Sequence, residues 1–247
     1  MPRIDVSVAT PDGDCPATLH VPDGGGPAPA VILYTDAGGV RETLRVMADR
    51  LAGSGYVTLL PDVYYRAGEW TPFDAATVFS IPAERERMTT LMRSVTAERA
   101  DRDAGAFLDF LAERPEVSGT VVGTTGYCMG GRISLLVAGR HPERVGAAAS
   151  IHGGWLAATD DSDSPYLLAD RIRATVYVAA AQNDDWFPPD QFERLKAAFE
   201  SVGVRYTMDM YPAAHGFAVP DNPTHDPAAE ERHWTALSEL FDANLGG

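Results

Sequence analysis

Continuous apolar runs alternate along this chain with segments in which apolar residues recur at helical spacing. The runs predict buried strands over residues 31–34, 56–60, 120–125, 145–151, 175–180 and 204–211. The helical segments lie at residues 42–52, 83–97, 100–113, 132–138, 189–202 and 228–245. Strands that are apolar throughout are buried on both faces, and their alternation with helices is typical of a mostly parallel, doubly wound α/β sheet.

The first residues follow a different pattern, because polar and apolar positions alternate on both sides of a turn. Residues 4–8 and 17–21 flank Thr10-Pro11-Asp12-Gly13, which predicts an antiparallel hairpin at one edge of the sheet. A chain of 247 residues is long enough for one large α/β domain. We therefore expect residues 1–247 to fold as a single domain.

Composition narrows the possible partners. The formal net charge of −15 argues against nucleic acid or an anionic membrane as a partner. The first residues do not form a signal peptide, and no apolar run approaches the ~18 residues of a membrane span. Two cysteines, Cys15 and Cys128, are too few for a disulfide framework, which favours a reducing compartment. We predict a cytoplasmic monomer or homodimer whose partner is a small molecule.

Residues 126–130 form a G-x-C-x-G pattern between a predicted strand and a predicted helix. Strand, tight turn and helix are the context of a nucleophile elbow. The two glycines permit a strained turn that would expose Cys128 at the positive end of the helix, where a thiolate is favoured. The backbone N–H of Met129 would then donate to an oxyanion. The alternative is a small buried cysteine that only packs strand against helix.

A thiol nucleophile needs a base, and the base needs an orienting carboxylate. His215 follows the last predicted strand, and Asp184 follows the strand before it, so both should lie at the carboxyl edge of the sheet. The order nucleophile, acid, histidine is that of α/β-hydrolases. His215 could instead be a loop histidine that serves packing. Asp184 is preferred to Asp185 because small-x-x-Asp-x-x-x-Pro matches the acid loop of such hydrolases, although either could cap the next helix.

A long irregular segment, residues 61–82, carries four aromatic residues. These are Tyr64, Tyr65, Trp70 and Phe73. Aromatic side chains in a loop of this length indicate a cap over a binding site. His152, in a His-Gly-Gly sequence downstream of the nucleophile, is expected in the wall of the pocket or in a loop. The remaining histidines and the acidic residues 160–163 lack the spacing of a metal site, so we predict no metal and no cofactor.

The sequence Gly126-Tyr127-Cys128-Met129-Gly130-Gly131, with Asp184 and His215-Gly216-Phe217, resembles the dienelactone hydrolases, also called carboxymethylenebutenolidases. The likeness extends from the Asp12-Gly13 turn to the closing helix, and the cysteine elbow is its specific part. It implies the α/β-hydrolase fold. It also implies a cysteine that opens an enol-lactone ring through an acyl-enzyme, supported by the histidine and the aspartate.

The same resemblance assigns residues around the nucleophile. The glutamate that holds the resting thiol in the family corresponds to Asp36, one methylene shorter. The N–H of Ala37 would be the second donor of the oxyanion hole. An arginine that binds the substrate carboxylate corresponds to Arg87, with Arg85 as second choice, and a solvated charged helix face is the alternative for both.

Three further residues are expected to line the substrate site. Val219 stands four residues past the histidine, where family members that act on dienelactone carry a second arginine. Tyr64 and Trp70 would add apolar surface that suits a larger or less charged acyl group. The sequence therefore predicts a cysteine-dependent hydrolase of esters or lactones. The alternatives are an acyltransferase that forms the same acyl-enzyme and a redox-sensing protein that uses Cys128 as a peroxide-sensitive thiol.

Overall fold

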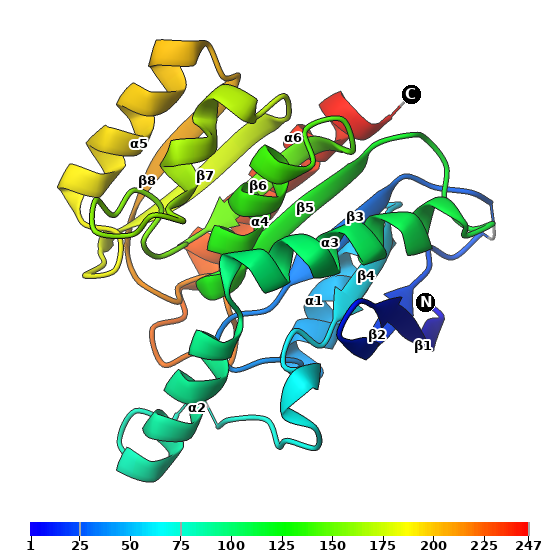
Figure 1. Ribbon diagram of the computed structural model, residues 1–247, viewed down its shortest axis with the longest axis horizontal. Coiled ribbons are helices and arrows are strands. Elements are labelled where there is room, and N and C mark those ends of the chain that lie inside the picture. Colours follow the sequence, from blue (N-terminus) through cyan, green and yellow to red (C-terminus); the bar gives the residue numbers. More distant parts are fainter. Residues whose placement is uncertain (25, 75, 247) are drawn as a thin grey trace.

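The computed structural model of the protein describes residues 1–24, 26–74 and 76–246. Within them an eight-stranded sheet has the order β1-β2-β4-β3-β5-β6-β7-β8 (Figure 1). The strands are β1 (Arg3–Thr10), β2 (Gly13–His20), β3 (Ala30–Tyr34), β4 (Val57–Pro61), β5 (Val122–Tyr127), β6 (Val145–Ile151), β7 (Thr175–Asn183) and β8 (Tyr206–Ala214). The helices are α1 (Glu42–Gly53), α2 (Pro82–Ser94), α3 (Ala97–Ala112), α4 (Met129–Arg140), α5 (Pro189–Val202) and α6 (Pro227–Leu245), with short 3₁₀ turns at Tyr65–Ala67 and Pro165–Arg171.

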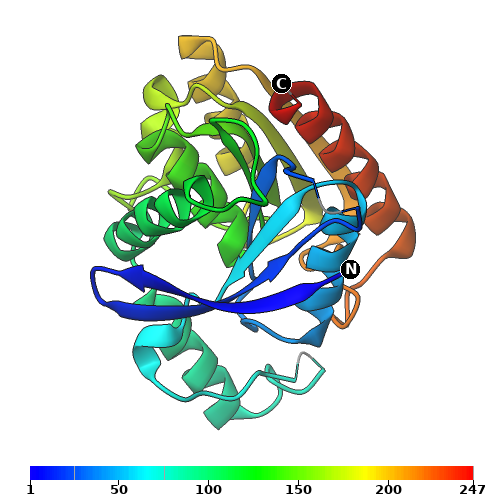
Figure 2. The same cartoon turned by 90° about the vertical axis from the view of Figure 1, so that its right-hand side faces the viewer.

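The predicted doubly wound sheet and its edge hairpin are confirmed. β1 pairs with β2, and β2 with β4, in antiparallel fashion, whereas the pairs from β4 through to β8 are parallel. Figure 2 shows the hairpin of β1 and β2 running across one side of the molecule. Because the central strands are parallel, their carboxyl ends meet at one edge, and the loops there carry the candidate site.

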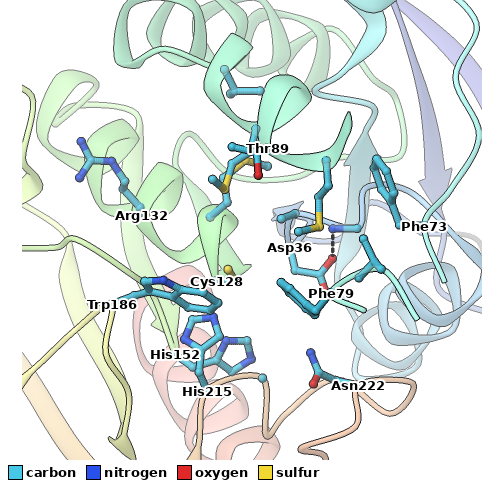
Figure 3. Close-up of a pocket in the computed structure, with 18 of the residues that line it drawn as sticks. Asp36, Phe73, Phe79, Thr89, Cys128, Arg132, His152, Trp186, His215 and Asn222 are labelled. Atoms are coloured by element: carbon cyan, nitrogen blue, oxygen red, sulfur yellow. Dashed lines mark hydrogen bonds between the residues drawn. The ribbon is translucent and has the colours of Figure 1, made fainter. Parts of the chain in front are cut away.

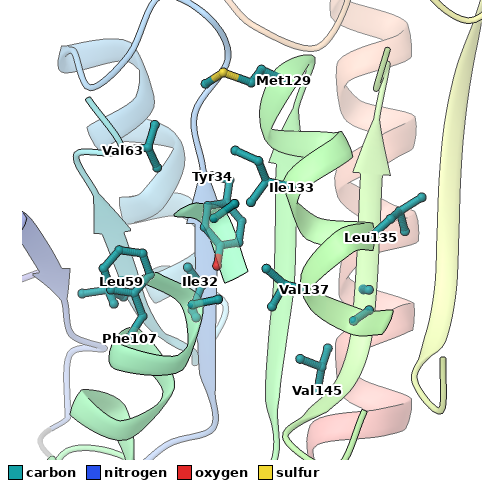
Figure 4. Packing of buried hydrophobic residues seen from close by; sticks show 14 of the residues in the cluster. Ile32, Tyr34, Leu59, Val63, Phe107, Met129, Ile133, Leu135, Val137 and Val145 are labelled. Atoms are coloured by element: carbon teal, nitrogen blue, oxygen red, sulfur yellow. The ribbon is translucent and has the colours of Figure 1, made fainter. Parts of the chain in front are cut away.

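Side chains of the central strands alternate between two buried cores. Ile32 and Tyr34 of β3 pack with α3 and α4 on one face (Figure 4), whereas Val31 and Leu33 pack with α1 and α6 on the other. This period of two is the reason that these strands are apolar at every position. The predicted apolar stripe of α3 is also buried, and it consists of Phe107, Leu108 and Leu111.

The structure shifts several element boundaries toward the site. β5 extends to Tyr127 and α4 begins at Met129, so Cys128 is the one residue between strand and helix. β8 runs to Ala214 and ends directly before His215. The predicted strands and helices stopped short here, because glycine and alanine near these ends weaken the apolar pattern. Cys128 and His215 therefore each follow the last residue of a strand directly.

A cap, defined here as residues 62–74 and 76–96, leaves the body of the molecule between β4 and α3. Its helix α2 projects from the rest of the chain (Figure 1) and buries only Met88 and Leu91. α3 then begins where the Thr96 hydroxyl accepts the Arg99 N–H at 3.2 Å, as an N-cap does. The cap is therefore anchored mainly by the residues before α2, of which Val63, Tyr64, Phe73 and Val78 are buried in the core.

Candidate active site

Cys128 occupies a strained turn, as the predicted elbow requires. Its φ of 54° and ψ of −115° are unusual for a residue with a side chain. A Cβ on Gly126 would lie 2.2 Å from the Gly130 carbonyl carbon, so only glycine allows strand and helix to approach this closely. The thiol is partly exposed and lines a cavity (Figure 3).

His215 and Asp184 are joined by a hydrogen bond. The His215 Nδ1 lies 2.7 Å from Asp184 Oδ2, and the other oxygen of Asp184 accepts the Trp186 N–H at 2.9 Å. The Asp184 side chain is 1% exposed, whereas Asp185 is exposed to solvent. The geometry therefore agrees with the choice of Asp184 over Asp185 as the partner of the histidine.

The surroundings of His215 favour its charged form. Burial lowers the pKa of His215, but the negative charge of the Cys128 thiolate and the hydrogen bond to Asp184 outweigh burial and raise the pKa to about 10. Nε2 is buried and forms no hydrogen bond with the described residues, and the Trp186 ring packs edge-on against the imidazole at 4.3 Å. One nitrogen is thus fixed by Asp184, and the other is available to exchange a proton.

The backbone amides of Ala37 and Met129 are the predicted donors of an oxyanion hole. Both residues line the cavity beside Cys128, and within the described residues neither N–H donates a hydrogen bond. Tyr64 supports both from behind, because its hydroxyl donates to the Ala37 carbonyl at 3.0 Å and lies 3.7 Å from the Met129 Sδ. Ala37 and Met129 therefore lie on the same cavity as Cys128, and their role as oxyanion donors stays a prediction.

The cavity has a volume of about 670 Å³. Its sheet side carries Cys128, His215 and His152, and its cap side carries Phe73 and Phe79 (Figure 3). His152 is buried with a φ of 39°, and its ring lies 5.0 Å from that of His215, so it lies in the pocket wall as expected. Most of the lining is apolar, which suits an organic substrate.

Asp36 does not bind the thiol as predicted. Its Oδ1 and Oδ2 accept hydrogen bonds from the Arg41 guanidinium at 2.7 and 2.9 Å, and Oδ1 also accepts the Gly38 N–H. A bidentate arginine is a strong partner for a carboxylate, and the shorter side chain of aspartate keeps the group beside it. Asp36 still lines the cavity, but its oxygens are directed to Arg41.

Arg87 lies outside the cavity, and Arg85 lines it. The Arg87 guanidinium sits 3.7 Å from the Phe73 ring centroid and donates to Glu84 and to the Thr71 carbonyl. The second choice of the sequence, Arg85, occupies the cavity-facing stripe of α2, where Arg93 follows two turns later. The prediction for Arg87 was therefore wrong, because the side of α2 that faces the cavity carries Arg85 and not Arg87.

Val219, Tyr64 and Trp70 do not line the cavity either. After His215 the chain turns at Gly216, whose φ is +90°, and this turn directs Val219 into the core under the sheet, where it is fully buried. Tyr64 is buried behind the wall, and Trp70 packs on Gly39 while its Nε1 donates to Asp62. Of the predicted aromatic cap residues, Phe73 is the one that lines the cavity.

Several lining residues escaped the sequence analysis. They include Arg41, Phe79, Arg93, Arg132, Trp186 and Asn222. Trp186 stands two residues after Asp184, so its place beside the histidine could have been inferred from the acid loop. The position of Arg41 could not be predicted from neighbouring residues, because one of its carboxylate partners, Asp221, is 180 residues away in sequence.

The described residues contain neither a candidate metal site nor a helix that could span a membrane. Over residues 1–24, 26–74 and 76–246, no group of three or more His, Cys, Asp or Glu side chains is arranged to hold a metal ion. Among the helices of those same residues, none has the length and apolar character needed to cross a membrane.

Comparison with known proteins identifies the family. Residues 15–245 match the model of the dienelactone hydrolase family. A protein of Escherichia coli (strain K12), provisionally named a carboxymethylenebutenolidase, is 30% identical over 223 residues, which cover 87% of this chain and 77% of that protein.

Two solved structures share the fold. A provisionally named dienelactone hydrolase from Klebsiella pneumoniae subsp. pneumoniae MGH 78578 has a TM-score of 0.83 at 22% identity, covering 97% of this chain and 98% of its own. A dienelactone hydrolase-like promiscuous phosphotriesterase from metagenomic libraries has a TM-score of 0.75 at 27% identity, covering 99% of both chains. The resemblance predicted from the elbow is confirmed: the chain belongs to the dienelactone hydrolase family and is a hydrolase.

Proposed function

We propose that this hydrolase cleaves lactones or esters through an acyl-enzyme on Cys128, with His215 as proton carrier and Asp184 as its orienting partner. The observation that carries the proposal is the shared cavity. A partly exposed thiol, an imidazole fixed at Nδ1 by a buried carboxylate, and two unused backbone N–H groups all border it. These are the parts that acyl transfer through a nucleophilic residue requires.

Each group has a step in this proposal. The Cys128 thiolate attacks the carbonyl carbon, and the developing oxyanion accepts hydrogen bonds from the N–H groups of Ala37 and Met129. Collapse of the intermediate breaks the ester bond, and the leaving oxygen takes the proton from His215 Nε2. Water then attacks the thioester while neutral His215 accepts one of its protons, which releases the carboxylic acid and restores the Cys128 thiolate beside protonated His215.

The cavity lining favours an acyl group that is largely apolar and has an anionic end. Val78, Phe79, Met88 and Met92 form apolar wall on the cap side. Arg85 and Arg93 on α2 line the same cavity and form no side-chain hydrogen bond or ion pair with the described residues. An arginine without a protein partner is a ready donor to a carboxylate. We therefore propose a carboxylate-bearing lactone or aryl ester as the preferred substrate, with neutral esters also accepted.

A panel of substrates tests the proposal. Purified wild type is assayed against lactones and aryl esters with and without a carboxylate, and against a phosphotriester, because one structural relative carries that name. We expect turnover of the carboxylic esters and, in quenched reactions, an acyl adduct on Cys128 by mass spectrometry. Absence of both turnover and adduct across the panel would contradict the proposal. A thioester that passes to an added alcohol or amine faster than to water would indicate the acyltransferase.

A redox-sensing role for Cys128 has less support. A sensor thiol is commonly paired with a resolving cysteine. Cys15 is fully buried in β2, where its Sγ donates to the Asp62 carbonyl at 3.4 Å, and burial raises the pKa of its thiol.

We propose the cytosol as the location of the protein, because both of its cysteines are free. We also propose that residues 1–247 form a single domain, because one sheet runs through the described chain.

A further inference from the structure

Arg41 connects the two loops that carry the oxyanion donor and the catalytic histidine. Its Nη1 and Nη2 donate to Asp36 at 2.7 and 2.9 Å, and its Nε and Nη2 donate to Asp221 at 2.7 and 2.8 Å. Its side chain is 8% exposed, and that of Asp36 is 10% exposed. Asp36 directly precedes Ala37, and Asp221 lies six residues after His215. One buried guanidinium therefore binds a carboxylate on each side of the site.

Asp36 and Cys128 line the same cavity, and the Tyr64 hydroxyl contacts the residue that follows each of them, at 3.0 Å from the Ala37 carbonyl and 3.7 Å from the Met129 Sδ. Burial raises the pKa of the Tyr64 hydroxyl, the charges of Asp36 and Cys128 raise it further, and Arg41 acts in the opposite direction. These four groups therefore share one electrostatic environment. An unpaired carboxylate there would disfavour the thiolate, because like charges at short range in a partly buried site repel strongly.

The charged or titratable groups that line the cavity of Cys128, or lie directly behind its wall, come from every element around it. They are Asp36 and Arg41 between β3 and α1, Tyr64 after β4, Arg85 and Arg93 on α2, Arg132 on α4, His152 after β6, Asp161 in the following loop, and His215 with Asp184 behind it. Arg132 is paired with Asp161 at 2.7 Å, and Asp184 is paired with His215. Asp36 is thus the acid whose charge would act on Cys128 if Arg41 were absent.

We propose that Arg41 is a positioning residue that neutralises Asp36 beside Cys128, so that the resting thiol pairs with His215 instead of with Asp36. The same contacts hold the Ala37 amide in register with the His215 loop. This inference rests on Cys128 as the nucleophile of the proposed function. It differs from the arrangement that the family resemblance implied, in which the acid after the third strand holds the resting thiol.

The test is a titration of the thiolate in the absence of substrate. Thiolate absorbance at 240 nm and the rate of iodoacetamide alkylation are followed against pH, with Cys128→Ala as the blank that removes any contribution from Cys15. Arg41→Gln leaves Asp36 unpaired, so the midpoint should rise by about one unit or more. Asp36→Asn leaves Arg41 with extra positive charge, so the midpoint should fall. The double variant should return toward the wild-type midpoint.

Two further variants separate charge from folding. Arg41→Lys keeps the charge but loses the bidentate geometry, so its midpoint should stay near wild type while kcat falls. Arg50→Gln, which removes an arginine of α1 that is paired with the Glu231 carboxylate at 2.7 Å, should leave the midpoint unchanged. Each variant is checked for native circular dichroism.

The outcomes are distinct from those of the activity assay. Opposite shifts in Arg41→Gln and Asp36→Asn support the inference, whether or not an ester is found that the enzyme turns over. Shifts in the same direction, or unchanged midpoints in folded variants, overturn the inference and leave Arg41 with only a structural role, in which it connects Asp36 and Asp221. If Arg41→Gln fails to fold, Asp36→Asn alone decides, since an unchanged or raised midpoint in that variant contradicts the inference.

Discussion

The sheet wall and the cap wall of the cavity are built in different ways. The sheet wall holds Cys128, Asp184 and His215 directly after β5, β7 and β8, and the buried Asp184 carboxylate is hydrogen-bonded to His215. The cap wall consists of Phe73, Val78 and Phe79 before α2 and of one side of α2, where Arg85 and Arg93 are exposed. The groups that we propose for bond cleavage are thus attached to the core, whereas the arginines that we propose for substrate choice are exposed to solvent. Changes in the sheet wall should therefore have large effects, and changes in the cap small ones.

The largest effect is expected at the nucleophile. Cys128→Ala should abolish ester hydrolysis, and one equivalent of iodoacetamide should inactivate the wild type, because the partly exposed thiol is the proposed nucleophile. Cys15→Ala, the matched control at a buried cysteine, should stay active and sensitive to the reagent. Activity retained in Cys128→Ala would move the chemistry to another residue.

The next effect separates two adjacent acids. Asp184→Asn should lower kcat by as much as about 10⁴-fold, because His215 loses the partner that fixes its tautomer. The loss can be smaller than in serine hydrolases, since a thiol is the better nucleophile. Asp185→Asn, at the exposed neighbour, should stay within about tenfold of wild type. The reverse order in steady-state kinetics would reassign the acid.

A third effect concerns the titration of His215. Its pKa is raised from the ordinary 6.5 to about 10, so the protonated form contributes stability that is complete below pH 6.5 and is lost as the pH rises toward 10. Nuclear magnetic resonance of the imidazole should show it protonated at neutral pH. In Cys128→Ala the midpoint should fall, because the thiolate charge that raises it is gone. A midpoint near 6.5 in both proteins would exclude the ion pair.

The smallest effect is expected in the cap. Arg85 is exposed, so a substrate carboxylate there forms a solvent-screened pair worth about 0.2–1 kcal/mol, or up to about fivefold in kcat/KM. Arg85→Ala should lower turnover of a carboxylate-bearing ester by that factor and leave the neutral analogue unchanged. Arg87→Ala is the control, because its guanidinium lies on Phe73 away from the cavity. Equal losses on both substrates would make Arg85 structural.

Local patterns in the sequence were sufficient for the sheet wall. The elbow depends on two glycines four residues apart, and His215 and Asp184 each stand directly after an apolar strand. In a parallel sheet such positions meet without any knowledge of side-chain contacts. The choice between two adjacent acids was also possible, because the acid loop has its own short motif.

The cap wall could not be predicted in the same way. Arg85 and Arg87 are two residues apart on one helix, which places them about 200° apart around its axis. Because the residues around them are charged, the sequence does not show which side of the helix faces the cavity. Val219 was misplaced because one left-handed glycine, Gly216, redirects the chain into the core. The tie from Arg41 to Asp221 joins segments far apart in sequence, which a single sequence does not reveal.

The contact between Gly130 and β3 has a consequence for how this enzyme can change. A Cβ at Gly130 would lie 2.3 Å from the Tyr34 carbonyl oxygen and 2.5 Å from that of Thr35. The segments that precede Ala37 and follow Met129 therefore touch main chain to main chain, and the spacing of the two amides does not depend on any rotamer. Replacement of α2 would leave that spacing intact, because Tyr64, whose hydroxyl donates to the Ala37 carbonyl, lies outside this helix. Selection or a designer can therefore exchange α2 for new substrate preference while the backbone around Cys128 is inherited unaltered.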